Sequence, residues 1–109
     1  MRFLLAVLFL VPTVAFAQMP PKKYDKPYPA HLLTVIEVEY GQARAYCRKF
    51  YNPQSMAKYG CATLYEDGTC EIVVSKPNRA KNPGYRKSDV MRHEQAHCHG
   101  WGADHPGAR

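Results

Sequence analysis

The chain has 109 residues, of which 46% are hydrophobic and 22% are charged. This length suffices for one domain and excludes a multidomain enzyme. Lys and Arg number 15 against 9 Asp and Glu, and the resulting formal charge of +6 suits either anionic partners or simple solubility. The basic residues are scattered and form no stripe along a helix, so we expect no nucleic-acid partner.

The first residues have the pattern of a secretory signal peptide over 1–17. A basic start precedes an apolar run over residues 3–11, and Ala15-Phe16-Ala17 has the small-residue pattern of a cleavage site. The apolar run is shorter than the about 20 residues that span a bilayer. We therefore expect cleavage before Gln18, a secreted or periplasmic protein, and no integral membrane segment after cleavage.

The mature part contains all the cysteines. In an exported chain, an even number of cysteines favours a disulfide framework over free thiols. Each disulfide can add about 2–4 kcal/mol to the stability of a domain too small to bury a large core. We expect two disulfides among Cys47, Cys61, Cys70 and Cys98.

Residues 18–30 differ in composition from the rest of the mature chain. They contain four prolines and three lysines, a combination that disfavours helices and ladders and offers little apolar surface. This predicts a flexible leader, followed by one domain over residues 31–109.

Residues 34–50 have two successive periodicities. Polar and apolar side chains alternate over residues 34–40, which predicts a half-buried strand that ends at Gly41. Residues 42–50 are good helix formers with apolar side chains at helical spacing, which predicts a short amphipathic helix. The strand face contains Thr34, Ile36, Val38 and Tyr40, and the helix face contains Ala43, Tyr46, Cys47 and Phe50.

Residues 61–74 are predicted to form a β-hairpin. Two strand-like runs flank Asp67-Gly68, a dipeptide that favours the two positive φ values of a tight two-residue turn. Pairing of Glu66 with Thr69 would place Tyr65 opposite Cys70. The face predicted to pack on the core then contains Cys61, Thr63, Tyr65, Cys70, Ile72 and Val74.

A second helix is predicted over residues 89–99, after a loop over residues 75–86. Ser88 is the expected N-cap, Asp89 suits the first turn, and Gly100 is the expected stop. The order strand, helix, hairpin, helix predicts a small single α+β domain.

The predicted hairpin register restricts the disulfide pairing. It separates Cys61 from the residue opposite Cys70 by about 14 Å, whereas bonded cysteines have Cα atoms within about 7 Å. Cys61–Cys70 is thus disfavoured, and each hairpin cysteine should reach one helix. Of the two remaining pairings we favour Cys47–Cys61 with Cys70–Cys98, because the first closes the shorter loop and the second would fix the last helix.

The predicted C-terminal helix contains the motif His93-Glu94-Gln95-Ala96-His97, of the form HExxH. Histidines four residues apart lie on one helix face and can bind the same Zn²⁺ ion. Glu94 then points toward water activated by the metal and is the candidate general base. The alternative is a solvated helix end in which the two histidines only interact with the helix dipole.

A zinc site requires a third protein ligand. His105 is our choice, because the chain turns at Gly100 and imidazole is a common zinc ligand. Asp104 is then either a residue that orients His105 or the substitute ligand. His99 points away from the face of His93 and His97. Weaker upstream candidates are His31 and Glu71.

The segment from His93 to His105 resembles the active-site helix and turn of zincin metallopeptidases. The glycine three residues after His97 is similar to the metzincin pattern HExxHxxGxxH, although Ala103 occupies the third-ligand position of that pattern. Metzincins also have a methionine-containing turn, for which too few residues follow His105. The segment therefore resembles small exported bacterial or phage-type metallopeptidase-like proteins that end in HExxHC-x-GW-x-x-DHP.

This resemblance implies hydrolysis of a peptide or peptidoglycan-stem amide bond, with zinc on His93, His97 and His105 and with Glu94 as general base. The alternative is a disulfide-stabilised zinc-binding interaction domain without catalysis. We expect a monomer. Tyr85, Tyr65 or His99 could supply a proton donor, and we assign none of them. Trp101 is expected to cover the core beneath the helix end.

Overall fold

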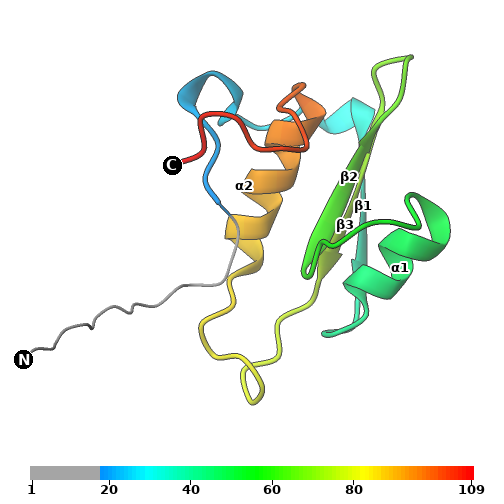
Figure 1. Cartoon of the computed structure of the whole chain (residues 1–109), viewed down its shortest axis with the longest axis vertical. Helices are drawn as coiled ribbons and strands as arrows, with labels where there is room; N and C mark the ends of the chain where they lie inside the picture. Colours follow the sequence, from blue (N-terminus) through cyan, green and yellow to red (C-terminus); the bar gives the residue numbers. More distant parts are fainter. Residues whose placement is uncertain (1–17) are drawn as a thin grey trace, which may run out of the picture.

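Two helices lie on opposite faces of a three-stranded sheet in the computed structural model, which describes residues 18–109 (Figure 1). The predicted signal peptide lies outside these residues. The fold is therefore a small α+β domain, as predicted. Its elements are the 3₁₀ turns η1 (Lys22–Tyr24) and η2 (Ala30–Leu32), strands β1 (Leu33–Val38), β2 (Gly60–Leu64) and β3 (Cys70–Ser75), and helices α1 (Ala43–Phe50) and α2 (Lys87–Cys98).

Strand β3 is the centre of the sheet, in the order β1-β3-β2. It pairs in parallel with β1 and antiparallel with β2. Its consecutive residues Ile72, Val73 and Val74 are all buried, because α2 covers one face of the strand and α1 covers the other. A continuous apolar run is typical of a strand buried on both faces.

The predicted hairpin exists, but its register is shifted by one residue. Leu64, rather than Tyr65, lies opposite Cys70. Gly68 N–H donates to the carbonyl of Tyr65, and Tyr65 N–H donates to the carbonyl of Thr69, so the loop has three residues. Within this loop only Gly68 has a positive φ, of 90°, whereas the predicted two-residue turn requires two residues with positive φ. The Asp67 carboxylate stabilises the longer loop by accepting hydrogen bonds from the backbone and hydroxyl of Thr69.

This shift moves the β2 side chains to the other face of the sheet, because side chains alternate along a strand. Cys61 shares a face with Val73 and lies toward α1, while Cys70 shares a face with Ile72 and lies toward α2. The predicted common face for Cys61, Thr63 and Tyr65 with Cys70, Ile72 and Val74 is thus wrong.

The favoured disulfides are nevertheless confirmed. Cys47 in α1 is bonded to Cys61, and Cys70 is bonded to Cys98 in α2. Each disulfide joins a helix to the sheet face that this helix covers. The second one fixes the C-terminal end of α2 against the central strand.

The prediction for helix α2 is wrong at its N-terminal cap and correct at its C-terminal end. It begins at Lys87, and no side chain caps it, so the predicted Ser88 cap is wrong; Asp89 instead pairs with Arg86 in the first turn. Gly100 ends the helix, as predicted, with a φ of 101°. Trp101 N–H donates to the carbonyl of Ala96 and Gly100 N–H donates to that of His97, the paired hydrogen bonds of a Schellman motif.

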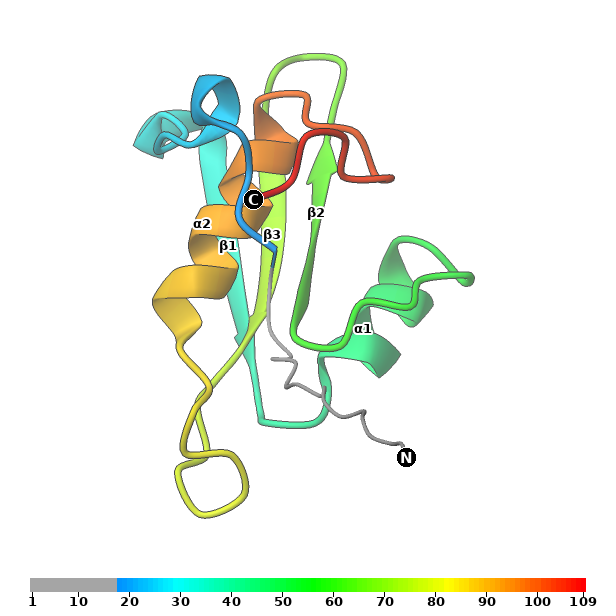
Figure 2. The ribbon, with the colours of Figure 1, turned by 60° about the vertical axis from the view of Figure 1, so that its left-hand side comes forward.

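Residues 18–30 form an ordered segment that packs on α2, in contrast to the predicted flexible leader. Tyr28 N–H donates to the Gln95 side chain, and Asp25 forms an ion pair with Arg92 of α2. Pro20 is fully buried. Composition favoured flexibility because the segment has little apolar surface, but polar contacts to α2 and to the C-terminus hold it in place. Figure 2 shows the segment beside α2 and the C-terminus.

None of the helices within residues 18–109 combines the length and the apolar character that crossing a membrane requires.

Candidate metal centre

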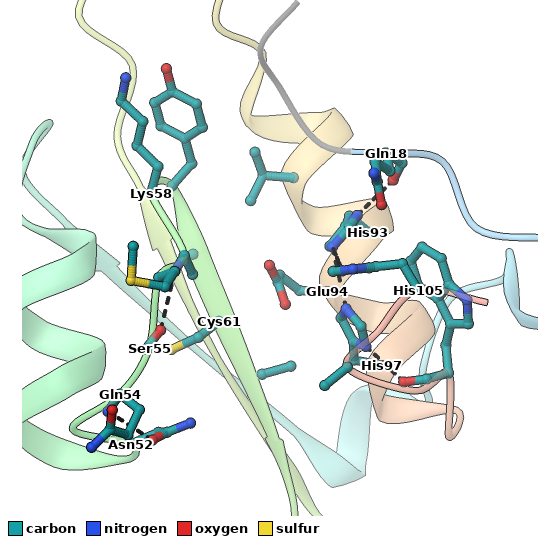
Figure 3. A pocket seen from close by; sticks show the side chains of 18 residues that line it. Gln18, Asn52, Gln54, Ser55, Lys58, Cys61, His93, Glu94, His97 and His105 are labelled. Carbon is teal, nitrogen blue, oxygen red and sulfur yellow. Dashed lines mark hydrogen bonds between the residues drawn. The ribbon is translucent and has the colours of Figure 1, made fainter. Parts of the chain in front are cut away.

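Three imidazoles converge beside the last turns of α2 (Figure 3). His93 and His97 lie one helical turn apart, and the chain after Gly100 folds back to bring His105 to them. The Nε2 atom of His93 is 3.1 Å from Nε2 of His105 and 3.2 Å from Nε2 of His97. Two nitrogens bound to the same tetrahedral zinc ion lie about 3.4 Å apart. The three histidines could therefore hold one metal ion.

The proton positions support this interpretation. Nδ1 of His93 lies 2.6 Å from the carbonyl oxygen of Gln18, and Nδ1 of His97 lies 2.7 Å from that of Trp101. A carbonyl oxygen only accepts hydrogen bonds, so each Nδ1 carries a proton and each neutral ring has its lone pair on Nε2. These two lone pairs face each other and repel unless a cation lies between them. The donor set thus fits a metal ion.

Burial keeps the two helical histidines neutral. It lowers the pKa of His93 to about 4 and also lowers the pKa of His97, in both cases because the charged ring would lose its hydration. Neutral imidazole is the form that binds metals. At neutral pH both rings are therefore ready to bind without first losing a proton.

Trp101 forms the floor of the centre. Its side chain is buried, and its ring stacks on His97 with a centroid distance of 4.9 Å and contacts His93 and His105 edge-on. The indole N–H donates to the carbonyl of Pro106. Trp101 is thus buried as expected, but it supports the imidazoles and does not cover the two core clusters.

The loop that carries His105 is tightly folded. His105 has a φ of 59°, a left-handed conformation that costs energy in a residue with a side chain. A side chain at Gly102 would approach the Asp104 carboxylate to 2.9 Å, so Asp104 would have to move to accommodate one. Contacts of the His105 ring with His93 and Trp101 hold this backbone conformation. Strained residues of this kind are common at functional sites.

Glu94 lies next to the imidazoles on α2, and its carboxylate points into a cleft of about 730 Å³ (Figure 3). The opposite wall consists of residues 52–62, which lead into strand β2. Glu94 is only 6% exposed, and burial raises the pKa of its carboxyl to about 8. The arrangement places a buried carboxyl group and three histidines that could hold a metal ion on the same wall of one cleft.

The other candidate residues lie elsewhere. Asp104 is exposed and outside the histidine cluster, and His99 Nε2 faces the carbonyl of Pro27. His31 lies in η2, and Glu71 accepts hydrogen bonds from Tyr51 and Tyr65 on the sheet face toward α1. The candidate proton donors Tyr65 and Tyr85 are thus engaged away from the cleft, since Tyr85 donates to the carbonyl of Ser75.

The sequence motif did not identify Gln18. Its carbonyl is the acceptor for His93, although it lies 75 residues away in the chain. A main-chain acceptor has no residue-type signal, so no motif could have indicated it.

The third ligand can be tested by comparing His105→Ala with Asp104→Asn. We expect His105→Ala to weaken zinc binding by more than the about 10–100-fold typical of a residue that only supports a ligand. Asp104→Asn should leave the affinity nearly unchanged, because Asp104 is exposed and outside the cluster. Competition with a chromogenic chelator measures both affinities, and a larger loss for Asp104→Asn would reverse the two assignments.

Comparisons of the chain with protein-family models, with curated proteins and with solved structures find no match.

Proposed function

We propose that this protein is an exported zinc-dependent hydrolase that cleaves a peptide or peptidoglycan-stem amide bond, with Glu94 as the general base. The observation that supports this best is the convergence of three imidazole nitrogens next to the Glu94 side chain in one cleft. Two disulfides are typical of proteins in an oxidising compartment and support export.

Zinc is the metal that we assign to the site. Imidazole suits zinc, and three protein ligands with a fourth open position are typical of catalytic zinc sites. Within residues 18–109, the cluster contains three histidines and no fourth protein ligand. A structural site would be closed by four protein ligands. The donor count therefore favours hydrolysis over the alternative of a zinc-binding interaction domain.

Each residue of the site then has a separate task. A bound zinc ion would polarise the substrate carbonyl and lower the pKa of a water molecule in the cleft. His93, His97 and His105 hold the ion, and the hydrogen bonds at Nδ1 of His93 and His97 orient their rings. A metal ion nearby would favour the ionised form of Glu94. In that form Glu94 accepts the proton from the attacking water and can return it to the leaving nitrogen.

The cleft has the size of a site for a short peptide segment. Its volume of about 730 Å³ falls within the about 300–1,000 Å³ common for ligand pockets. The wall facing Glu94 includes Met56, which is 70% exposed, and Lys58. Arg44 and Arg48 of α1 hold this wall by donating to the carbonyls of Met56 and Ser55. A substrate would thus lie between α2 and a wall anchored on α1.

Hydrolysis can be tested with the purified protein and a library of peptides and peptidoglycan stem peptides. We expect cleavage that stops when a chelator removes the metal and resumes when one equivalent of zinc is added. Mass spectrometry of the products identifies the bond. Tight zinc binding without cleavage of any library member would contradict the proposal and favour the interaction domain.

A further inference from the structure

The two ends of residues 18–109 meet beside the metal centre (Figure 2). Arg109 N–H donates to the carbonyl of Met19 at 2.8 Å, and Met19 N–H donates in return at 3.3 Å. The Arg109 guanidinium also donates to the carbonyl of Pro20 at 2.7 Å. Residues 18–25 and 105–109 together are called the terminal clasp below.

Asp25 joins the terminal clasp to α2. Its two carboxylate oxygens accept hydrogen bonds from Nε and Nη2 of Arg92, at 2.8 and 2.6 Å, and Oδ2 also accepts one from Arg109 at 2.7 Å. The side chain of Asp25 is only 13% exposed. Two-pronged pairs between arginine and carboxylate are among the stronger polar contacts and fix the relative orientation of both groups. Both guanidinium groups hold the pKa of Asp25 below its ordinary value, with Arg92 the larger influence.

The terminal clasp reaches two of the three metal-binding histidines. At one end, the carbonyl of Gln18 is the acceptor for Nδ1 of His93. At the other end, His105 itself begins the C-terminal part, and its carbonyl accepts a hydrogen bond from Ala108. A Cβ atom added at Gly107 would lie 3.6 Å from the Pro21 ring, so the two segments run close together here. His97 is different, because its acceptor is the carbonyl of Trp101 at the end of its own helix.

We propose that the terminal clasp is a positioning device for the metal centre, which orients His93 through the Gln18 carbonyl and holds the loop of His105. This inference rests on the metal centre of the proposed function, but not on hydrolysis. The physical reason is that a metal-binding imidazole needs a fixed ring and a proton on its other nitrogen, and an acceptor at Nδ1 provides both. Loss of the terminal clasp frees two ligands and leaves the third in place.

Asp25→Asn tests this role, because the amide keeps the shape of the side chain but lacks the charge that pairs with two arginines. We expect about 10–100-fold weaker zinc binding, the range found when supporting partners of metal ligands are lost. Glu39→Gln is the matched control, since it makes the same chemical change in the surface ion pair of Glu39 with Lys76.

Exchange of the imidazole protons distinguishes positioning from a general loss of stability. In the zinc-loaded protein, NMR can follow the Nδ1 protons of His93 and His97 separately. Asp25→Asn should speed exchange of the His93 proton with solvent and leave the His97 proton unchanged. Equal acceleration at both histidines would indicate general loosening of the fold and would overturn the inference.

A second variant keeps the test decisive if Asp25→Asn does not fold. Arg109→Gln removes the guanidinium from the end of the chain and should weaken zinc binding in the same direction. Wild-type affinity in either variant that folds would overturn the role of the terminal clasp and leave the metal centre standing. Failure of the wild-type protein to bind zinc would instead contradict the metal centre, so the two failures are distinguishable.

Discussion

Replacing Glu94 by glutamine is expected to lower hydrolytic turnover by about 10²–10⁴-fold, the contribution of a general base, while zinc remains bound. Glutamine has nearly the same shape as glutamate, but its neutral amide cannot accept a proton from water. None of the three converging imidazoles is changed, so the affinity for metal should stay close to that of the wild type. Measurement of kcat/KM together with the metal content separates the two effects.

Glu66→Gln is a suitable control for this experiment. Glu66 lies in the exposed loop between β2 and β3, so the same chemical change there should leave turnover unaltered. Unchanged turnover in Glu94→Gln would show that another group accepts the proton. Loss of zinc from Glu94→Gln would show that the carboxylate contributes to metal binding.

Replacing His97 by alanine is expected to abolish tight zinc binding and with it the stabilisation that zinc gives to the folded protein. A ligand that binds only the folded state adds about 4 kcal/mol when its free concentration is 1,000 times its Kd. The wild type should therefore show a rise in Tm on addition of zinc, and His97→Ala should show almost none. Differential scanning calorimetry with and without zinc measures this difference.

The relevant quantity is the difference between the Tm values measured with and without zinc. His97 also stacks on Trp101, so its loss lowers the stability of the metal-free protein as well. His99→Ala is the matched control, since His99 lies on the same chain segment and faces Pro27 rather than the metal centre. A full zinc complement in His97→Ala would contradict the assignment of this ligand.

The part of the centre that lies on α2 could be predicted from sequence because it depends on local geometry. The helical period places His93 and His97 on one face whatever the helix packs against. The glycine after the helix was also recognisable, since only a residue without a side chain readily adopts the positive φ of Gly100. The choice of His105 as the third residue of the cluster followed from a similar local argument, because few residues remain after the turn.

The pairing of the cysteines was predicted correctly with an incorrect register. The expected two-residue turn needed a positive φ at Asp67, and a loop of three residues with a positive φ at Gly68 alone avoids this cost. The predicted pairing is still correct, because Cys61 is distant from Cys70 in both the predicted and the observed hairpin register. In the structure the two cysteines also lie on opposite faces of the sheet, which separates them more completely than distance along the strand.

The amino-acid sequence alone was enough to predict the α+β class, the helix that carries His93 and His97, and the preferred disulfides, since each prediction used residue spacing along the chain. Only the tertiary structure decided three further features: the parallel pairing of β1 with β3, the burial of Glu94, and the fixed conformation of residues 18–30. Each of these features depends on contacts between residues far apart in the chain. Local sequence patterns do not predict the free energy of such contacts. Asp25 illustrates the reason, because its two partners, Arg92 and Arg109, lie 67 and 84 residues away.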